Sequence, residues 1–89
     1  MPRNPLHDGV HNADMNRTRT VAAKTLNSIQ DHRPAEQIAG IAVMFLLLCE
    51  RFDFSAPAAL EVAGNILRQA KFADADHFQG VRDYLANEL

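Results

Sequence analysis

The sequence predicts an all-α protein, a compact array or bundle of about four helices preceded by a flexible N-terminal arm. Apolar residues recur every three or four positions from about residue 16 onward, and this is the period of one helix face. Prolines and capping residues divide the periodic region into segments of helix length. No strand-like alternation, glycine-rich loop or internal repeat is visible. Because 89 residues have room for one small core, residues 16–89 are predicted to form a single domain.

The N-terminal arm is predicted to comprise residues 1–15. It contains Pro2, Pro5 and Gly9 and has no hydrophobic period, so it is expected to be flexible or to order on a partner. A chain started at Met15 would keep every predicted helix. Whether residues 1–14 belong to the native protein is therefore open.

The first helix is predicted to begin between residues 16 and 20 and to run to about residue 30. Ala22, Leu26 and Ile29 form its apolar stripe, since residues four and seven positions apart share a face. It should end before Pro34, because the residue that precedes a proline is disfavoured in a helix, whereas proline itself suits a first helical turn.

The second helix, residues 34–52, is apolar on two opposite faces. The main face is predicted to be the core of the domain and contains Ile38, Ile41, Ala42, Phe45, Leu48, Cys49 and Phe52. The opposite side carries Gly40, Val43, Met44 and Leu47, with Glu36, Glu50 and Arg51 towards the ends. A helix that is apolar on both sides is expected to be buried on both sides.

The third helix is predicted over residues 56–71, with Ser55 as its N-cap and Pro57 in its first turn. The side of this helix that is predicted to pack on the second helix contains Ala56, Ala59, Leu60, Val62, Ala63, Ile66, Leu67 and Ala70. Its many alanines would allow close packing there. The fourth helix is predicted over residues 75–87, with Asp74 as N-cap, and its inward positions are Phe78, Val81, Leu85 and Leu89.

The second apolar face of the 34–52 helix has two interpretations. In one, this helix is the centre of a monomer and the other three helices surround it. In the other, Gly40, Val43, Met44 and Leu47, rimmed by Glu36, Glu50 and Arg51, form an interface with a second copy or another protein. We favour the interface because three short helices cover two opposite faces with difficulty. A homodimer is the specific expectation, because closed twofold dimers are the commonest assembly.

The charge distribution argues against specific DNA binding through the C-terminal helix. Residues 74–89 hold four acidic groups and one arginine, whereas a recognition helix must approach phosphates. The N-terminal third is the basic part of the chain. A weak contact with nucleic acid through Arg3, Arg17, Arg19 and Lys24 is therefore the alternative function, and nucleic acid is expected to be an unlikely partner.

No metal site or cofactor is expected. His7, His11 and Asp14 have a ligand-like spacing, which on a helix would align two imidazoles and a carboxylate. Pro5 and Gly9 disfavour a helix there. The three residues are therefore interpreted as incidental polar groups of the arm.

No enzyme activity is expected either. Cys49, the single cysteine, lies on the main apolar face of its helix and lacks the exposure that a nucleophile needs. Arg82 is the one charged group that helical spacing places among apolar neighbours. It could extend past Phe78, pair with Glu50 or Asp53, or contact a partner, and the sequence does not decide among these.

A cytoplasmic location is expected, with no membrane contact. The polar N-terminus contains no secretory signal, and the apolar run from Ile38 to Cys49 is shorter than the roughly 20 residues that a membrane-spanning helix needs. A single cysteine fits a reducing compartment.

The segments LLLCERFDF and FQGVRDYLANEL resemble stretches of uncharacterised small helical proteins encoded by tailed phages and prophages. The resemblance covers residues 34–89 and implies a phage-borne gene, without an activity or site residues to transfer. The expected function is therefore that of a small interaction module, a homodimer that binds and modulates a further protein. A host protein with a basic surface is one such target.

Overall fold

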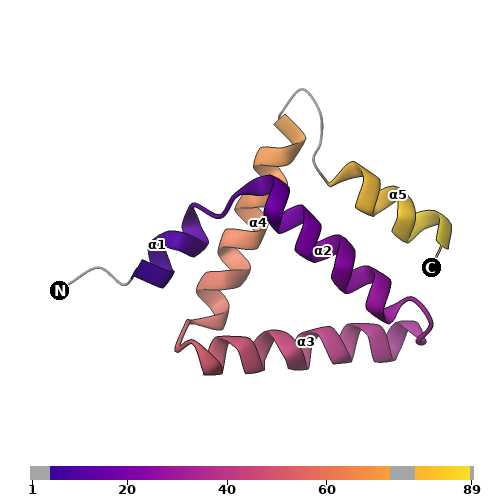
Figure 1. The fold of residues 1–89 in the computed structure, drawn as a ribbon, viewed down its shortest axis with the longest axis horizontal. Helices are drawn as coiled ribbons and strands as arrows, with labels where there is room; N and C mark the ends of the chain where they lie inside the picture. Colours follow the sequence, from indigo (N-terminus) through magenta and orange to yellow (C-terminus); the bar gives the residue numbers. More distant parts are fainter. Residues whose placement is uncertain (1–4, 73–77, 89) are drawn as a thin grey trace.

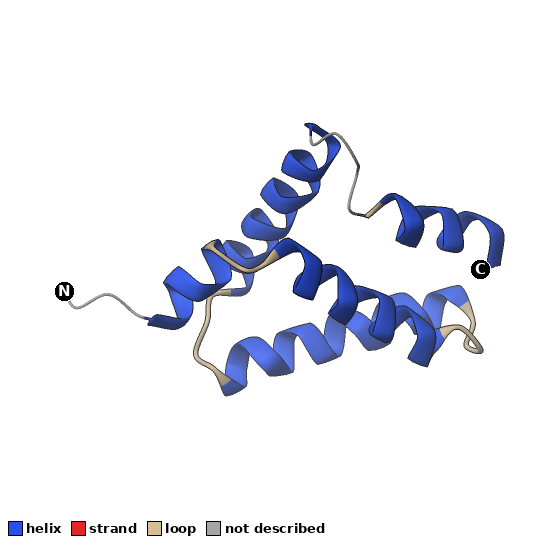
Figure 2. Ribbon diagram, turned by 45° about the horizontal axis from the view of Figure 1, so that its top comes forward, coloured by secondary structure: helices blue, strands red, loops and turns tan. Residues whose placement is uncertain are grey.

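The computed structural model describes residues 5–72 and 78–88 of the chain, and within them all regular structure is helical (Figures 1 and 2). The helices are α1 (Pro5–His11), α2 (Met15–Ile29), α3 (Pro34–Arg51), α4 (Ala56–Phe72) and α5 (Gln79–Glu88). The all-α fold is confirmed. The ends of α2, α3 and α4 lie within about a residue of their predicted positions. Phe78, predicted to be helical, lies in a turn, and α5 begins at Gln79. The predicted cap at Asp74 lies outside the described residues.

Helix α1 corrects the expectation that the N-terminal arm has no helix. Proline at its first position matches the backbone angle that a helix start requires. At its end, the backbone N–H and the side-chain amide of Asn12 both donate to the carbonyl oxygen of Asp8, at 3.0 and 2.9 Å. Helix α1 also packs beside α4. These contacts outweigh the cost of about 1 kcal/mol that Gly9 brings to the helix interior.

Short turns connect α1, α2, α3 and α4. The carboxylate of Asp14 accepts the backbone N–H of Arg17 at 2.8 Å and caps the start of α2. Arg33 has the extended backbone that precedes a proline, and Pro34 begins α3. The side-chain amide of the buried Gln37 donates to the carbonyl oxygen of Ile29 at 3.0 Å. This bond ties the end of α2 to the start of α3.

The turn from α3 to α4 is a Schellman motif with an aspartate at its left-handed position. Asp53 has φ 52°, its N–H donates to the carbonyl oxygen of Glu50 at 3.3 Å, and the N–H of Phe54 donates to that of Cys49 at 2.8 Å. The hydroxyl of Ser55 accepts the N–H of Ala58 at 3.3 Å, so the predicted N-cap of α4 is confirmed.

The array is flat. Helices α2, α3 and α4 outline a triangle in Figure 1, and α5 lies beside α2. Along its principal axes the backbone extends over 46, 33 and 17 Å, so the array is much thinner in one direction than in the other two. Among the described helices, α4 lies close to both α1 and α3.

Little of the apolar surface is buried. The buried apolar side chains of the described residues are Leu26, Val62, Ala70 and Phe78. The chain exposes 7066 Å², whereas a typical monomer of 9.9 kDa exposes roughly 5,200 Å². The radius of gyration is 14.2 Å, against about 12 Å for a folded domain of this length. Roughly 1,900 Å² is exposed beyond the expectation for a single domain.

The predicted burial of the main face of α3 is wrong for this single chain. Only Phe45 and Cys49 of that face are half-buried, and its other members, Ile38, Ile41, Ala42, Leu48 and Phe52, are exposed. The physical reason is the angle between the helices. Helices α2 and α4 diverge from α3, and grooves separate them from it along much of its length.

Candidate association surface on α3

Helix α3 exposes large apolar side chains around its whole circumference. Ile38 on the predicted core face is 72% exposed, and Leu47 on the opposite face is 51% exposed. The other large apolar side chains of α3 that are more than 40% exposed are Ile41, Val43, Met44, Leu46 and Leu48. A contiguous apolar surface of this kind is typical of a protein interaction site. The alternative in which α3 is the buried centre of a monomer is therefore wrong.

One line of side chains along α3, which we call the α3 stripe, consists of Glu36, Gly40, Val43, Leu47 and Arg51. These residues follow at intervals of three or four positions and so lie on one helix face. All five are exposed, and so is Met44 at the edge of the stripe. Glu50 flanks its C-terminal end and is also exposed. The structure thus brings together every residue of the predicted interface on one accessible side of α3, and their contact with a partner stays a prediction.

Gly40 has no packing partner within the chain. A Cβ atom built at this position meets no atom within 4 Å beyond the helix itself, and its φ is not positive. Glycine costs about 0.5–1 kcal/mol relative to alanine in the middle of a helix. Neither the backbone nor the packing of the single chain explains this residue.

Arg51 is held in place at the end of the stripe. Its guanidinium carbon lies 5.2 Å from the centroid of the Phe52 ring, which is the geometry of a cation–π contact. When a guanidinium stacks on a ring, its N–H donors lie in the guanidinium plane and stay available for hydrogen bonds. The side chain is therefore positioned for a hydrogen-bonded partner at low additional cost in conformational entropy.

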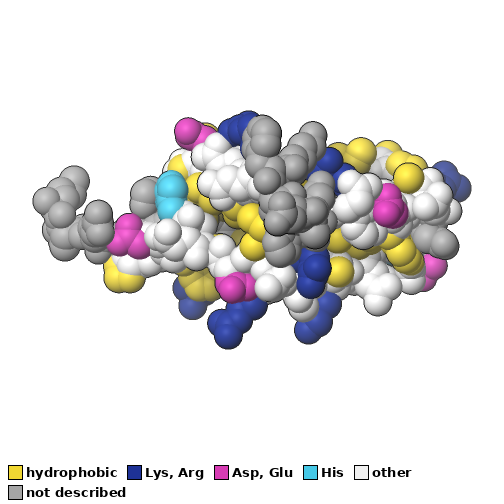
Figure 3. All heavy atoms as spheres, turned by 90° about the horizontal axis from the view of Figure 1, so that it is seen from above, with side chains coloured by type: hydrophobic (Ala, Val, Ile, Leu, Met, Phe, Trp, Pro, Cys, Tyr) yellow, Lys and Arg dark blue, Asp and Glu magenta, His cyan; other side chains and the backbone are white. Residues whose placement is uncertain are grey.

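A second apolar surface lies between α3 and α4. It is a groove of about 770 Å³ whose lining also includes Leu85 of α5. Its main apolar lining residues are Ile38, Ile41, Phe45, Leu46, Pro57 and Leu60. Figure 3, which views the molecule from above, shows that apolar side chains reach the surface on that face as well. Helical periodicity missed this surface because it placed Ile38 and Leu60 in the core.

Arg82 lines another groove, of about 370 Å³, between α2, α4 and α5, together with Phe78, Ile66 and Leu85. Its side chain is half-buried. No ion pair joins it to Glu50 or Asp53, both of which the structure describes, so the structure does not support that one of the three alternatives. The arginine instead extends along apolar neighbours, as long cationic side chains commonly do.

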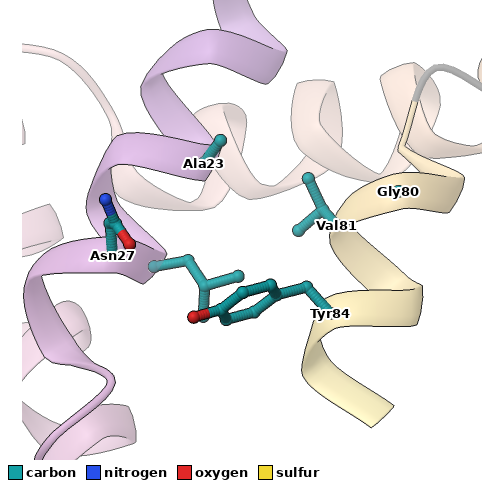
Figure 4. Close-up of a pocket in the computed structure, with 6 residues that line it drawn as sticks. Ala23, Asn27, Gly80, Val81 and Tyr84 are labelled. Atoms are coloured by element: carbon teal, nitrogen blue, oxygen red, sulfur yellow. The ribbon is translucent and has the colours of Figure 1, made fainter. Parts of the chain in front are cut away.

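The cavity between α2 and α5, about 290 Å³ in volume, has no catalytic arrangement (Figure 4). Val81 and Tyr84 of α5 point towards α2, where Ala23 and Asn27 face them. The Tyr84 hydroxyl is hydrogen-bonded to the side-chain oxygen of Gln30. This bond joins α5 to the end of α2 and is a structural contact.

The cationic residues of the alternative function do not form one patch. Arg17, Arg19 and Lys24 are all exposed on α2, and Arg3 lies outside the described residues. Arg17 and Lys24 are seven positions apart and share a face, whereas Arg19 lies on nearly the opposite side at 100° per residue. The structure therefore provides no single basic face on α2 for a phosphate backbone.

The three residues considered as metal ligands do not form one site. His7 and His11 both fall within α1, contrary to expectation, but the Asp14 carboxylate caps α2. Among the described residues, no group of three histidine, cysteine, aspartate or glutamate side chains could hold a metal ion. Cys49 has a free thiol and is half-buried. It is therefore less buried than a core residue, which was its predicted position.

Among the described helices, none is both long enough and apolar enough to cross a bilayer. No family model matches the sequence, and comparisons with curated proteins and with solved structures gave no match either.

Proposed function

We propose that this protein is a small association module that works as a homodimer through the α3 stripe and holds a further protein on the α3–α4 groove. The observation that carries the proposal is the exposure of apolar side chains on every side of α3. Apolar surface of this extent is favourably removed from water by a partner. The chain has no described helix that covers it.

The two surfaces on α3 are separate. The α3 stripe and the α3–α4 groove share no residue, so a dimer contact on the stripe leaves the groove accessible to a second partner.

An amphipathic helix is the partner element that fits the groove. Such helices place apolar residues into an apolar cleft between helices, and the groove between α3 and α4 is about 770 Å³ in volume with Gln37 as its one polar lining residue. Residues 34–89 carry eight acidic and four basic groups. A partner helix with basic residues beside its apolar face would suit this charge, and a host protein is one candidate source.

The test of the dimer uses a charged substitution on the stripe. Leu47→Glu introduces a charge at the centre of the proposed contact but replaces a side chain that is 51% exposed in the single chain. We expect a dimer for the wild-type protein and a monomer with unchanged helix content for Leu47→Glu. Analytical ultracentrifugation over a range of concentrations and circular dichroism measure the two properties.

Val21→Glu is the matched control. Val21 is an apolar residue of α2 that is 65% exposed, and it lies outside the stripe and the groove. Its substitution should leave the dimer intact. A wild-type protein that stays monomeric at high micromolar concentration would contradict the proposal, and so would a Leu47→Glu variant that dimerises like the wild type.

A further inference from the structure

The α3 stripe is complementary to the stripe of a second copy that runs in the opposite direction. Its midpoint lies between Val43 and Met44. Gly40 and Leu47 lie at equal distances on either side of this point, and Glu36 and Arg51 form a second such pair. A twofold axis places residue i of one copy opposite residue j of the other, and residue j opposite residue i. An antiparallel contact centred on this midpoint therefore brings together a small residue with a large one and an acid with a base.

We infer that two copies of the chain pack their α3 stripes antiparallel about a twofold axis beside Val43 and Met44. Leu47 of each copy lies against Gly40 of the other, and Glu36 of each copy pairs with Arg51 of the other. The inference rests on the proposed homodimer and specifies its geometry.

Gly40 gives the first support for this geometry. No atom of its own chain lies where a Cβ would be, so the missing side chain leaves open space on the surface of α3. Glycine on a helix face allows another chain to approach its backbone closely. Leu47 is the largest apolar side chain of the stripe and is 51% exposed, which makes it the natural residue to enter that space.

The end charges give the second support. Arg33 and Glu36 lie at the N-terminal end of α3, and Glu50 and Arg51 lie at its C-terminal end, and all four are exposed. Antiparallel packing sets one end against the other, so each acid has a base within reach. In a parallel pair, Glu36 would face Glu36 and Arg51 would face Arg51, and like charges at close range repel. Opposed helix dipoles favour the antiparallel pair as well.

Charge exchange tests the orientation. Glu36→Arg and Arg51→Glu each replace two symmetry-related attractions with repulsions in the antiparallel dimer. Exposed ion pairs are each worth up to about 1 kcal/mol, so each single variant should raise the dissociation constant on the order of tenfold. The combined Glu36→Arg, Arg51→Glu variant restores opposite charges and should return to within about threefold of the wild type.

Other results of the charge exchange would overturn the inference. In a parallel dimer the single substitutions only exchange one like-charge contact for another, so single variants with unchanged affinity contradict the antiparallel geometry. A combined variant as weak as the single ones contradicts it too. In both cases the wild-type dimer survives, so the failure is distinct from a failure of the proposed function.

Disulfide crosslinking gives an independent readout. In a Cys49→Ala background, Glu36→Cys and Arg51→Cys proteins are oxidised separately and as a mixture, at concentrations well above the dissociation constant. A disulfide requires Cα atoms about 4.4–6.8 Å apart. We expect a covalent dimer in the mixture and none in either protein alone, because the two positions lie about 22 Å apart along α3. A disulfide in either protein alone, or no disulfide in the mixture, would overturn the inference.

Discussion

Glycine at position 40 lowers the stability of the single chain but allows the close contact of the proposed dimer. Its backbone is helical, and an alanine side chain would meet no atom of its own chain. In the single chain, alanine should therefore be the better residue by about 0.5–1 kcal/mol. In the dimer, the added methyl group would occupy the space into which Leu47 of the other copy fits.

The substitution Gly40→Ala should accordingly have two effects of opposite sign. In the monomeric Leu47→Glu background it should raise the free energy of unfolding by about 0.5–1 kcal/mol, as measured by urea denaturation. In the wild-type background it should weaken the dimer, as measured by ultracentrifugation. A dimer that is unchanged or strengthened by alanine would show that no close contact forms at this position.

At the scale of the element, α5 is the helix whose place depends most on a single polar contact. The Tyr84 hydroxyl is bonded to the side chain of Gln30, and the space between α2 and α5 includes a cavity of about 290 Å³. Phe78, the residue just before α5, is buried at 6% exposed and anchors the start of the helix. Leu85 on the same helix is 44% exposed and also lines the α3–α4 groove.

Tyr84→Phe should loosen α5 without unfolding the array. The substitution keeps the ring and removes one hydrogen bond, which contributes about 1 kcal/mol. Hydrogen exchange measured by mass spectrometry should become faster in residues 79–88, while exchange in α4 stays the same. Gln30→Leu removes the other partner and should give the same pattern. Equal acceleration across all helices would mean that α5 is not a separately opening unit.

For the whole molecule, the small core makes stability depend on assembly. Four apolar side chains of the described part are buried, and small domains have a low free energy of unfolding. A dimer that binds only the folded chain adds stability by mass action. The thermal midpoint should therefore rise by several degrees when the protein concentration is raised a hundredfold.

The Leu47→Glu variant separates this effect from other effects of concentration. Its midpoint should be lower than that of the wild type and independent of concentration, as measured by differential scanning calorimetry. A wild-type midpoint that does not change with concentration would mean that the folded single chain is stable by itself.

The sequence by itself determined α2, α3 and α4 and their ends. Pro34, Ser55 and Pro57 act on their own backbone and on the next turn, and the bounds of α3 and α4 follow from them closely. It also determined which side chains share the α3 stripe, since this depends only on the helical repeat. Helix α1 was missed because its support comes from α4, a contact between distant parts of the chain.

Only the tertiary structure decided which apolar faces are covered. Periodicity showed that α3 is apolar on two sides, but burial depends on where other helices lie across from it. The short turns set α2 and α4 at angles to α3, so Ile38 and Leu60, predicted to be in the core, line an open groove instead. The physical reason is that capping and helical period are local properties of the chain, whereas the angle between helices is set by the sum of many weak contacts.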